Sequence, residues 1–274
     1  MMTQPLVFAI STRASAWRTL DWWISTAHDA GALPLDIELT TALRRRRLGI
    51  TSWRQALMRP EVASVWIRAT RIGPPSLALS TEMLSPPTIC TPHQTICLQH
   101  DAIADPKGDL DDAVASAARL RASLEPSTRV ALAVTPINPG GGREHLVRLQ
   151  ALRLRAAEWD VDLALDLTGK LDETWEAEAA MLRMSKRLAV IRLGYPPPNA
   201  PGSTKWKLVR RILSAAVDVE FSGVVAIAPT VRPWRLVGSA DAEREPRQSV
   251  ADLRSDFRTR SLALHESSRQ RGAR

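Results

Sequence analysis

The chain has 274 residues and a formal net charge of +8 at pH 7, and 45% of its residues are hydrophobic. This length and apolar content suit one barrel-sized domain with a filled interior. No stretch approaches the ~20 apolar residues that a membrane-spanning helix needs, so we expect no membrane partner and a cytoplasmic location. The two cysteines, Cys90 and Cys97, cannot supply a disulfide framework or a zinc site, and we expect both to be reduced.

Arginine carries the positive charge, because only five of the 37 basic residues are lysine. The run Arg44 to Arg47 falls in a helical stretch, where a solvated basic face is the simplest interpretation. Three Phe and one Tyr are too few for the aromatic stacking that single-stranded nucleic acids need. We therefore expect no nucleic-acid partner, while a homo-oligomer stays open.

Eight short apolar, β-branched runs recur along the chain at intervals of about thirty residues, and most are followed by an amphipathic stretch. The runs cover residues 6–11, 33–39, 62–69, 95–100, 129–135, 161–167, 188–194 and 223–228. Eight strand-then-helix units are the number that closes a (β/α)8 barrel. The sequence therefore predicts an α/β protein with a TIM-barrel fold.

Amphipathic stretches between these runs predict the crossover helices. They cover residues 17–29, 40–59 with an interruption at Gly49, 109–124, 142–159, 173–187 and 204–217. Five prolines between residues 70 and 94 forbid a continuous helix, so an irregular connection is predicted between strands three and four, with a short strand over 77–80. We assign residues 1–238 to the barrel domain and 239–274 to a charged tail, partly helical and then disordered.

Two segments carry a resemblance to a known family. The opening Phe8-Ala9-Ile10-Ser11-Thr12, followed by a helix ending at Gly31 and the strand Leu35-Asp36-Ile37-Glu38-Leu39, resembles the start of the xylose isomerase-like barrels, the sugar phosphate isomerase and epimerase superfamily. The segment Asp166-Leu167-Thr168-Gly169-Lys170 is similar to that family's strand-six signature, in which an Asp is followed by Thr-Gly-His. Here Lys170 takes the place of the His, and one extra residue separates Asp166 from Thr168.

The resemblance implies a divalent metal, but the residues at the family's ligand positions depart from it. Members commonly use a Glu after strand five, an Asp or His on strand six, a His near strand seven and a Glu after strand eight. The corresponding neighbourhoods here hold Thr135, Asp166 with Lys170, Arg192, and residues 228–230. One carboxylate beside two cationic side chains cannot supply the ligands of a hard cation or of zinc. We predict no metal and no cofactor, with positive side chains partly taking the cation's place.

Ionisable residues near the carboxyl ends of the strands form the candidate site, because barrels place their function there. The candidate catalytic residues are Glu38, His100, Asp166 and Lys170. The candidate substrate-binding residues are Arg13, Arg68, Asp101 and Arg192.

The proposed roles follow from side-chain chemistry. Glu38 and His100 suit proton transfer. Lys170 suits a Schiff base with a carbonyl substrate, although a salt bridge with a neighbouring Asp is the simpler alternative. Arg68 and Arg192, on separate strands, suit a clamp on one small anionic molecule. On this hypothesis, Arg192→Ala weakens ligand binding and leaves the fold intact.

Two functions stay open. One is a metal-independent isomerase or epimerase acting on a small anionic sugar or keto acid, with a Schiff-base lyase as a variant. The other is a non-catalytic barrel that binds a ligand or partner after losing the family's metal site. Endonuclease chemistry is disfavoured, because it needs a cluster of His, Asp and Glu ligands that the sequence lacks.

Overall fold

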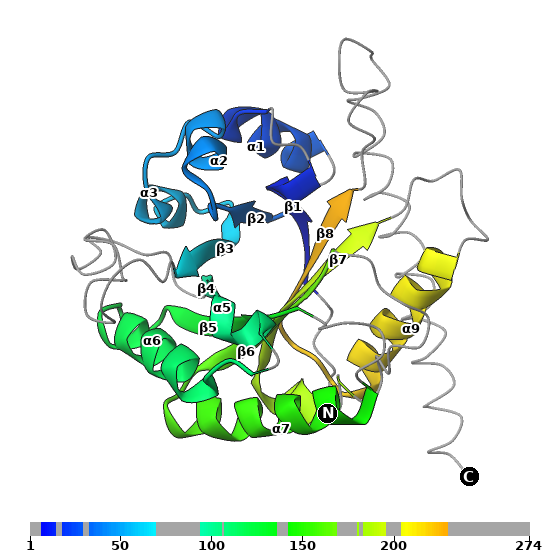
Figure 1. Ribbon diagram of the computed structural model, residues 1–274. Helices are drawn as coiled ribbons and strands as arrows, with labels where there is room; N and C mark the ends of the chain where they lie inside the picture. The colour runs from blue at the N-terminus through cyan, green and yellow to red at the C-terminus, as the bar shows by residue number, and fades with distance from the viewer. Residues whose placement is uncertain are drawn as a thin grey trace.

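The computed structural model describes residues 7–14, 18–29, 33–69, 94–105, 107–135, 142–168, 180, 183–195 and 204–229. Within them, eight parallel strands form a closed barrel in which each strand pairs with the next and β8 pairs with β1. Helices surround the barrel on its outer side (Figure 1). The predicted (β/α)8 barrel is confirmed. The strands are β1 (Val7–Ser11), β2 (Leu35–Glu38), β3 (Val62–Ala69), β4 (Thr95–His100), β5 (Arg129–Val134), β6 (Asp162–Leu167), β7 (Leu188–Tyr195) and β8 (Val224–Pro229).

The described helices follow the predicted crossovers closely. They are α1 (Leu20–Asp29), α2 (Ala42–Arg47), α3 (Trp53–Leu57), α5 (Asp101–Ala104), α6 (Leu110–Ala122), α7 (Gly142–Glu158) and α9 (Thr204–Asp218), with 3-10 turns η1 (Thr12–Ala14) and η2 (Ser185–Arg187). The short helix α5, directly after β4, was not predicted from the sequence. The proline-rich connection, most of the predicted helix 173–187 and the tail 239–274 lie outside the described residues.

The core has two parts, because side chains of a strand alternate between its two faces. The larger part packs between strands and helices and includes Ile96 and Leu98 of β4. The smaller part lies inside the barrel and includes Trp66, Cys97 and Ala131. Inside the barrel the apolar side chains are mostly small, and polar side chains fill much of the remaining interior near the carboxyl ends of the strands. In the described part of the chain, no helix is both long and apolar enough to cross a membrane.

Gly49 ends the first half of the second crossover, as the sequence predicts. It adopts a φ of +73°, and the Ile50 N–H donates to the Arg45 carbonyl across the turn at 2.9 Å. A left-handed residue just after a helix is the usual way to end it, and glycine adopts this conformation without a steric penalty. The turn directs the chain from α2 into α3 and thereby fixes α2 beside the mouth of the barrel.

We predict that Gly49→Ala lowers the free energy of unfolding by about 1 kcal/mol, because a Cβ atom strains a positive φ. No atom lies within 4 Å of the position that this Cβ would occupy, so the loss reports backbone strain without a clash. Gly49→Asn is the matched control and should lose less, since Asn tolerates this conformation better. Urea denaturation measures both, and an Ala variant as stable as the native protein would contradict the assignment.

Candidate active site at the mouth of the barrel

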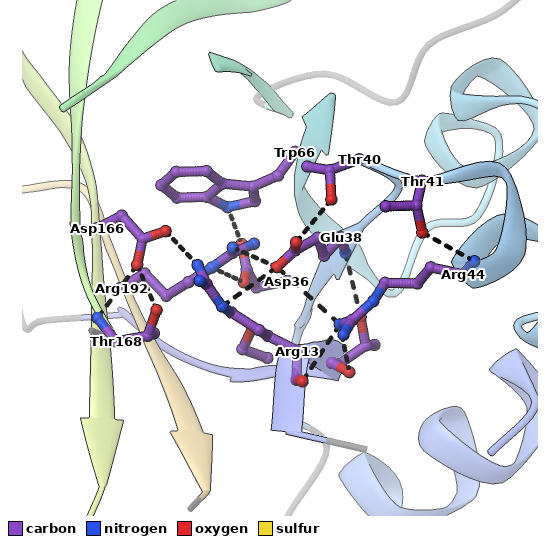
Figure 2. Close-up of polar contacts among 12 residues, drawn as sticks. Arg13, Asp36, Glu38, Thr40, Thr41, Arg44, Trp66, Asp166, Thr168 and Arg192 are labelled. Carbon is purple, nitrogen blue, oxygen red and sulfur yellow. Dashed lines mark hydrogen bonds and ion pairs between the residues drawn. The ribbon is translucent and has the colours of Figure 1, made fainter. Parts of the chain in front are cut away.

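A buried arginine and two carboxylates join opposite parts of the barrel. Asp36 and Glu38 lie two residues apart on β2, so both side chains point inward. Arg192, in the middle of β7, is 0% exposed. Its Nε donates to Asp36 Oδ2 at 2.7 Å, and its Nη1 donates to Glu38 Oε2 at 3.0 Å. The guanidinium group therefore lies between the two carboxylates inside the barrel (Figure 2).

Strand β3 supports the same group from one side. The Trp66 indole N–H donates to Asp36 Oδ1 at 2.5 Å, and the Ser64 hydroxyl donates to the same oxygen. The indole ring also stacks against Arg192, whose Cζ lies 3.7 Å from a ring centroid of Trp66. Cation–π contacts of this kind are strongest when they are removed from water, as this one is. Trp66 thus holds both members of the Arg192–Asp36 pair.

Arg13 extends these contacts toward solvent. It lies on η1, immediately after β1, and its Nη1 donates to Asp166 Oδ2 on β6. Its Nε is 3.6 Å from Glu38 Oε2, the oxygen that also accepts from Arg192. The Arg13 side chain is 36% exposed, whereas the side chains of Glu38 and Asp166 are 9% and 3% exposed. We call Arg13, Asp36, Glu38, Asp166 and Arg192 the ion network.

Threonine hydroxyls bind the remaining carboxylate oxygens. Thr40 Oγ1 donates to Glu38 Oε1 at 2.7 Å. The backbone N–H and the hydroxyl of Thr168 donate to Asp166 Oδ1 at 3.1 and 2.6 Å. All six carboxylate oxygens of the ion network therefore accept at least one hydrogen bond. Such saturation fixes the orientation of each carboxylate.

Arg44 of α2 braces the turn that carries Arg13. Its Nη1 donates to the backbone carbonyl of Arg13 at 3.2 Å and lies 4.0 Å from Glu38 Oε2. Partial burial, together with the nearby positive charges of Arg13 and Arg192, lowers the pKa of Arg44 despite the opposing effect of Glu38. The basic run of α2 thus contributes one arginine to the site, which sequence analysis had placed on a solvated face.

The electrostatics of the barrel interior keep Arg192 charged. Burial alone would lower its pKa, but Asp36, Glu38 and Asp166 outweigh burial and raise the pKa above the ordinary value for arginine. Burial also raises the pKa of the nearby Cys97 thiol, and the negative charge of Asp36 adds to this effect. Because the thiolate is the reactive form, these surroundings make Cys97 a poor nucleophile.

The structure brings together four of the eight predicted site residues: Arg13, Glu38, Asp166 and Arg192 (Figure 2). Arg68 and Asp101 instead pair with each other at 2.8 Å, with both side chains about half exposed. Arg68 and Arg192 therefore differ sharply in burial. Arg68 is thus paired with Asp101 at the rim of the barrel and is not part of the ion network.

His100 and Lys170 do not join this group in the described structure. The Nδ1 atom of His100 accepts from the Ala102 N–H of α5 at 3.2 Å, and its Nε2 lies 3.6 Å from Asp112 Oδ2 of α6. It caps helix α5 instead of reaching the barrel interior. Lys170 lies outside the described residues.

One expectation about Arg192 has to be corrected. Sequence analysis predicts that Arg192→Ala leaves the fold intact. This requires a partly exposed side chain, but Arg192 is fully buried between Asp36 and Glu38. Its removal would leave two buried carboxylates without their positive partner, which is strongly destabilising.

Sequence analysis missed several side chains that build the site, among them Asp36, Ser64, Trp66 and Arg44. A signal for Asp36 was present, because its two-residue spacing from Glu38 places both carboxylates on one face of a strand. No comparable signal marked Trp66 or Arg44.

The donor set does not fit a divalent cation. Asp36 and Glu38 already have a positive partner in Arg192, and every carboxylate oxygen of the ion network is in a hydrogen bond. Across the residues that the structure describes, no group of three or more His, Cys, Asp or Glu side chains could hold a metal ion. A guanidinium group donates hydrogen bonds and has no coordination sites, so the site offers a fixed positive charge.

Fold and site together define a (β/α)8 barrel with a polar network at the carboxyl ends of its strands. No known protein-family pattern matches the chain, and no curated protein matches it. A solved structure with a similar fold is that of the carboxyl transferase domain of Rhizobium etli pyruvate carboxylase with 3-bromopyruvate, at 12% identity and a TM-score of 0.49. The match covers 92% of this chain and 46% of that one, so this chain spans about half the length of its neighbour. The likeness carries no argument about activity.

We predict that Arg192→Ala lowers the free energy of unfolding by about 3–5 kcal/mol, the usual result of leaving a buried charge unpaired. Arg129→Ala is the control. It removes the partly exposed pair with Asp162 at the amino-terminal ends of β5 and β6 and should cost at most about 1 kcal/mol. Equal losses in chemical denaturation would show that Arg192 does not hold the barrel together.

Proposed function

We propose that the protein is a divergent member of the xylose isomerase-like barrels and acts without a metal on a small anionic sugar or keto acid. The observation that carries this proposal is the partly exposed Arg13 guanidinium between two buried carboxylates, Glu38 and Asp166, at the mouth of the barrel. Arginine is well suited to bind a carboxylate or phosphate, because its planar fork matches their oxygen atoms.

In this proposal, ligand binding also frees Asp166 and Glu38 from their contacts with Arg13. An anionic group that binds Arg13 competes with Asp166 for the Nη1 donor. Asp166 Oδ2 then loses its partner, and Glu38 loses the Arg13 contact on the side toward solvent. The two carboxylates come from β6 and β2 and face the space that Arg13 occupied. The bound molecule therefore lies between two groups that can accept a proton.

The chemistry that fits this pair is a proton transfer at a carbon next to a carbonyl. One carboxylate takes the proton, so that the C–H bond breaks and a carboxyl O–H bond forms. In an epimerisation the other carboxyl starts protonated and gives its proton to the opposite face of the same carbon, and exchange with solvent restores both groups. In an isomerisation the first carboxyl returns the proton to the neighbouring carbon, while the substrate's hydroxyl proton moves to the former carbonyl oxygen. The electron pair stays on the substrate as an enediolate between the steps, so no oxidant or metal is required.

A second candidate is a non-catalytic barrel that binds the same kind of anion. It is supported by the saturation of the ion network, since carboxylates that hold arginines in place do not need a chemical role. Both candidates use Arg13 for binding, and they differ only in whether a proton moves.

We predict that dihydroxyacetone phosphate, ribose 5-phosphate or 2-oxobutanoate raises the melting temperature, because a ligand that binds the native state stabilises it by mass action. Proton NMR in D2O should show deuterium entering the carbon next to the carbonyl of the binding compound faster than without protein. Glu38→Gln and Asp166→Asn should each slow this exchange by at least ~100-fold, the lower range for a general acid or base. Arg129→Ala should leave it unchanged.

Each outcome distinguishes the candidates. Binding that Arg13→Ala abolishes, without deuterium exchange, supports the non-catalytic barrel. Exchange that survives both carboxylate substitutions contradicts the assigned roles. Covalent labelling by borohydride with 2-oxobutanoate would favour the Schiff-base variant, since only an imine is trapped in this way. If none of the three compounds shifts the melting temperature, the site does not take this class of anion.

A further inference from the structure

One hydrogen-bond donor of the ion network lacks a partner. Nε and Nη1 of Arg192 bind Asp36 and Glu38, but among the described residues nothing accepts a hydrogen bond from the buried Arg192 Nη2. A buried, charged donor without an acceptor is costly, so such atoms commonly have a partner that the protein chain does not supply. Nη2 is therefore the atom of the ion network at which a hydrogen bond to an oxygen atom from outside the protein would stabilise the site most.

The surrounding charge determines which oxygen fits. Three carboxylates face two guanidinium groups in the ion network, of which that of Arg13 is turned toward solvent, and the guanidinium group of Arg44 lies further out, 4.0 Å from Glu38. The negative charges of Asp36, Glu38 and Asp166 all raise the pKa of Arg192, so all three are close enough to interact with it. A second anionic group at Nη2 would lie among these carboxylates and be repelled. A neutral acceptor, such as a carbonyl or hydroxyl oxygen, accepts the hydrogen bond without this penalty.

Arg13 lies next to Arg192, because both contact Glu38. Arg13 and Arg192 contact the same atom, Glu38 Oε2. The Arg13 side chain is partly exposed, whereas that of Arg192 is fully buried. Figure 2 shows both side chains reaching this carboxylate from different elements, Arg13 from η1 and Arg192 from β7. A molecule that takes the place of Arg13 beside Glu38 and Asp166 would therefore lie next to Arg192.

We propose that Arg192 Nη2 binds a neutral carbonyl or hydroxyl oxygen of the substrate while Arg13 binds its anionic group. This inference rests on the proposed function and narrows its substrate class to anions that carry a neutral oxygen close to the anionic group. Simple alkyl anions lack the acceptor, and dicarboxylates place a second anionic group among the carboxylates of the ion network. With a carbonyl substrate, the same hydrogen bond draws electron density toward oxygen and makes the adjacent C–H bond more acidic.

Matched ligands test this on the native protein. 2-Oxobutanoate, butanoate and ethylmalonate share a carbon skeleton and carry at C2 a carbonyl, only hydrogens, or a second carboxylate. Dihydroxyacetone phosphate and propyl phosphate form the corresponding phosphate pair. Isothermal titration should show the oxygen-bearing member of a binding series about tenfold to a hundredfold tighter than its alkyl partner, as for a hydrogen bond to a charged donor. Ethylmalonate should bind no better than butanoate.

Arg192→Lys is the matching variant, because it keeps the charge and loses the Nη2 donor. It should bring the affinity ratio between 2-oxobutanoate and butanoate, or between the two phosphates, close to one, while Arg129→Lys should preserve the ratio. If the alkyl anions bind the native protein as tightly as their oxygen-bearing partners, the Arg192 inference is wrong and the proposed anion site stands. If no anion of either series binds, the proposed function fails and this inference fails with it. The native series decides the matter even if Arg192→Lys does not fold.

Discussion

The Arg192 guanidinium, held between Asp36 and Glu38, is the interaction on which the arrangement of the barrel interior depends. It joins β7 to β2, which are separated by more than 150 residues in the chain. Removing three charged groups from water is expensive, and the attraction between them offsets this cost only when the hydrogen bonds are complete. Ser64, Trp66 and Thr40 supply the additional donors, so the network depends on residues that have no charge of their own.

The network has a fixed inner part and an outer part that can exchange partners. Arg192 and Asp36 are fully buried and stacked or bonded on several sides, whereas Arg13 is partly exposed and lies on a short 3-10 turn. Ion pairs near solvent are weak because water screens and replaces them, while buried pairs are costly to separate. Arg13 therefore exchanges partners more readily than Arg192, but a ligand that displaces it has to offset the loss of a positive partner for the buried Asp166. This difference in burial, more than the kinds of residue present, separates the proposed anion-binding role of Arg13 from the structural role of the Arg192–Asp36 pair.

The sequence was sufficient for the barrel because strands and helices differ in local pattern. The runs at 62–69 and 95–100 match β3 and β4 residue for residue, and Gly49 breaks the second crossover as expected. The site was predicted less well, since its contacts form only when the barrel closes. Arg192 was identified as a mouth residue, but nothing local shows that its side chain is fully buried. His100 has the chemistry of a catalytic residue, yet the alternation along β4 turns it toward α6.

A guanidinium group in place of a metal ion limits the chemistry that this barrel can perform. A metal ion accepts lone pairs and can exchange its ligands, so it can activate water as well as a carbonyl. Arg192 can only donate hydrogen bonds, and two of its donors are permanently engaged by Asp36 and Glu38. What remains is a fixed positive charge with one nitrogen atom, Nη2, that has no acceptor among the described residues. Such a group stabilises negative charge that develops on a carbonyl oxygen, as enolisation requires, but it does not bind and activate a water molecule as a metal ion does. A buried arginine at this place therefore fits the proposed proton transfer at carbon better than reactions that need a metal-activated water.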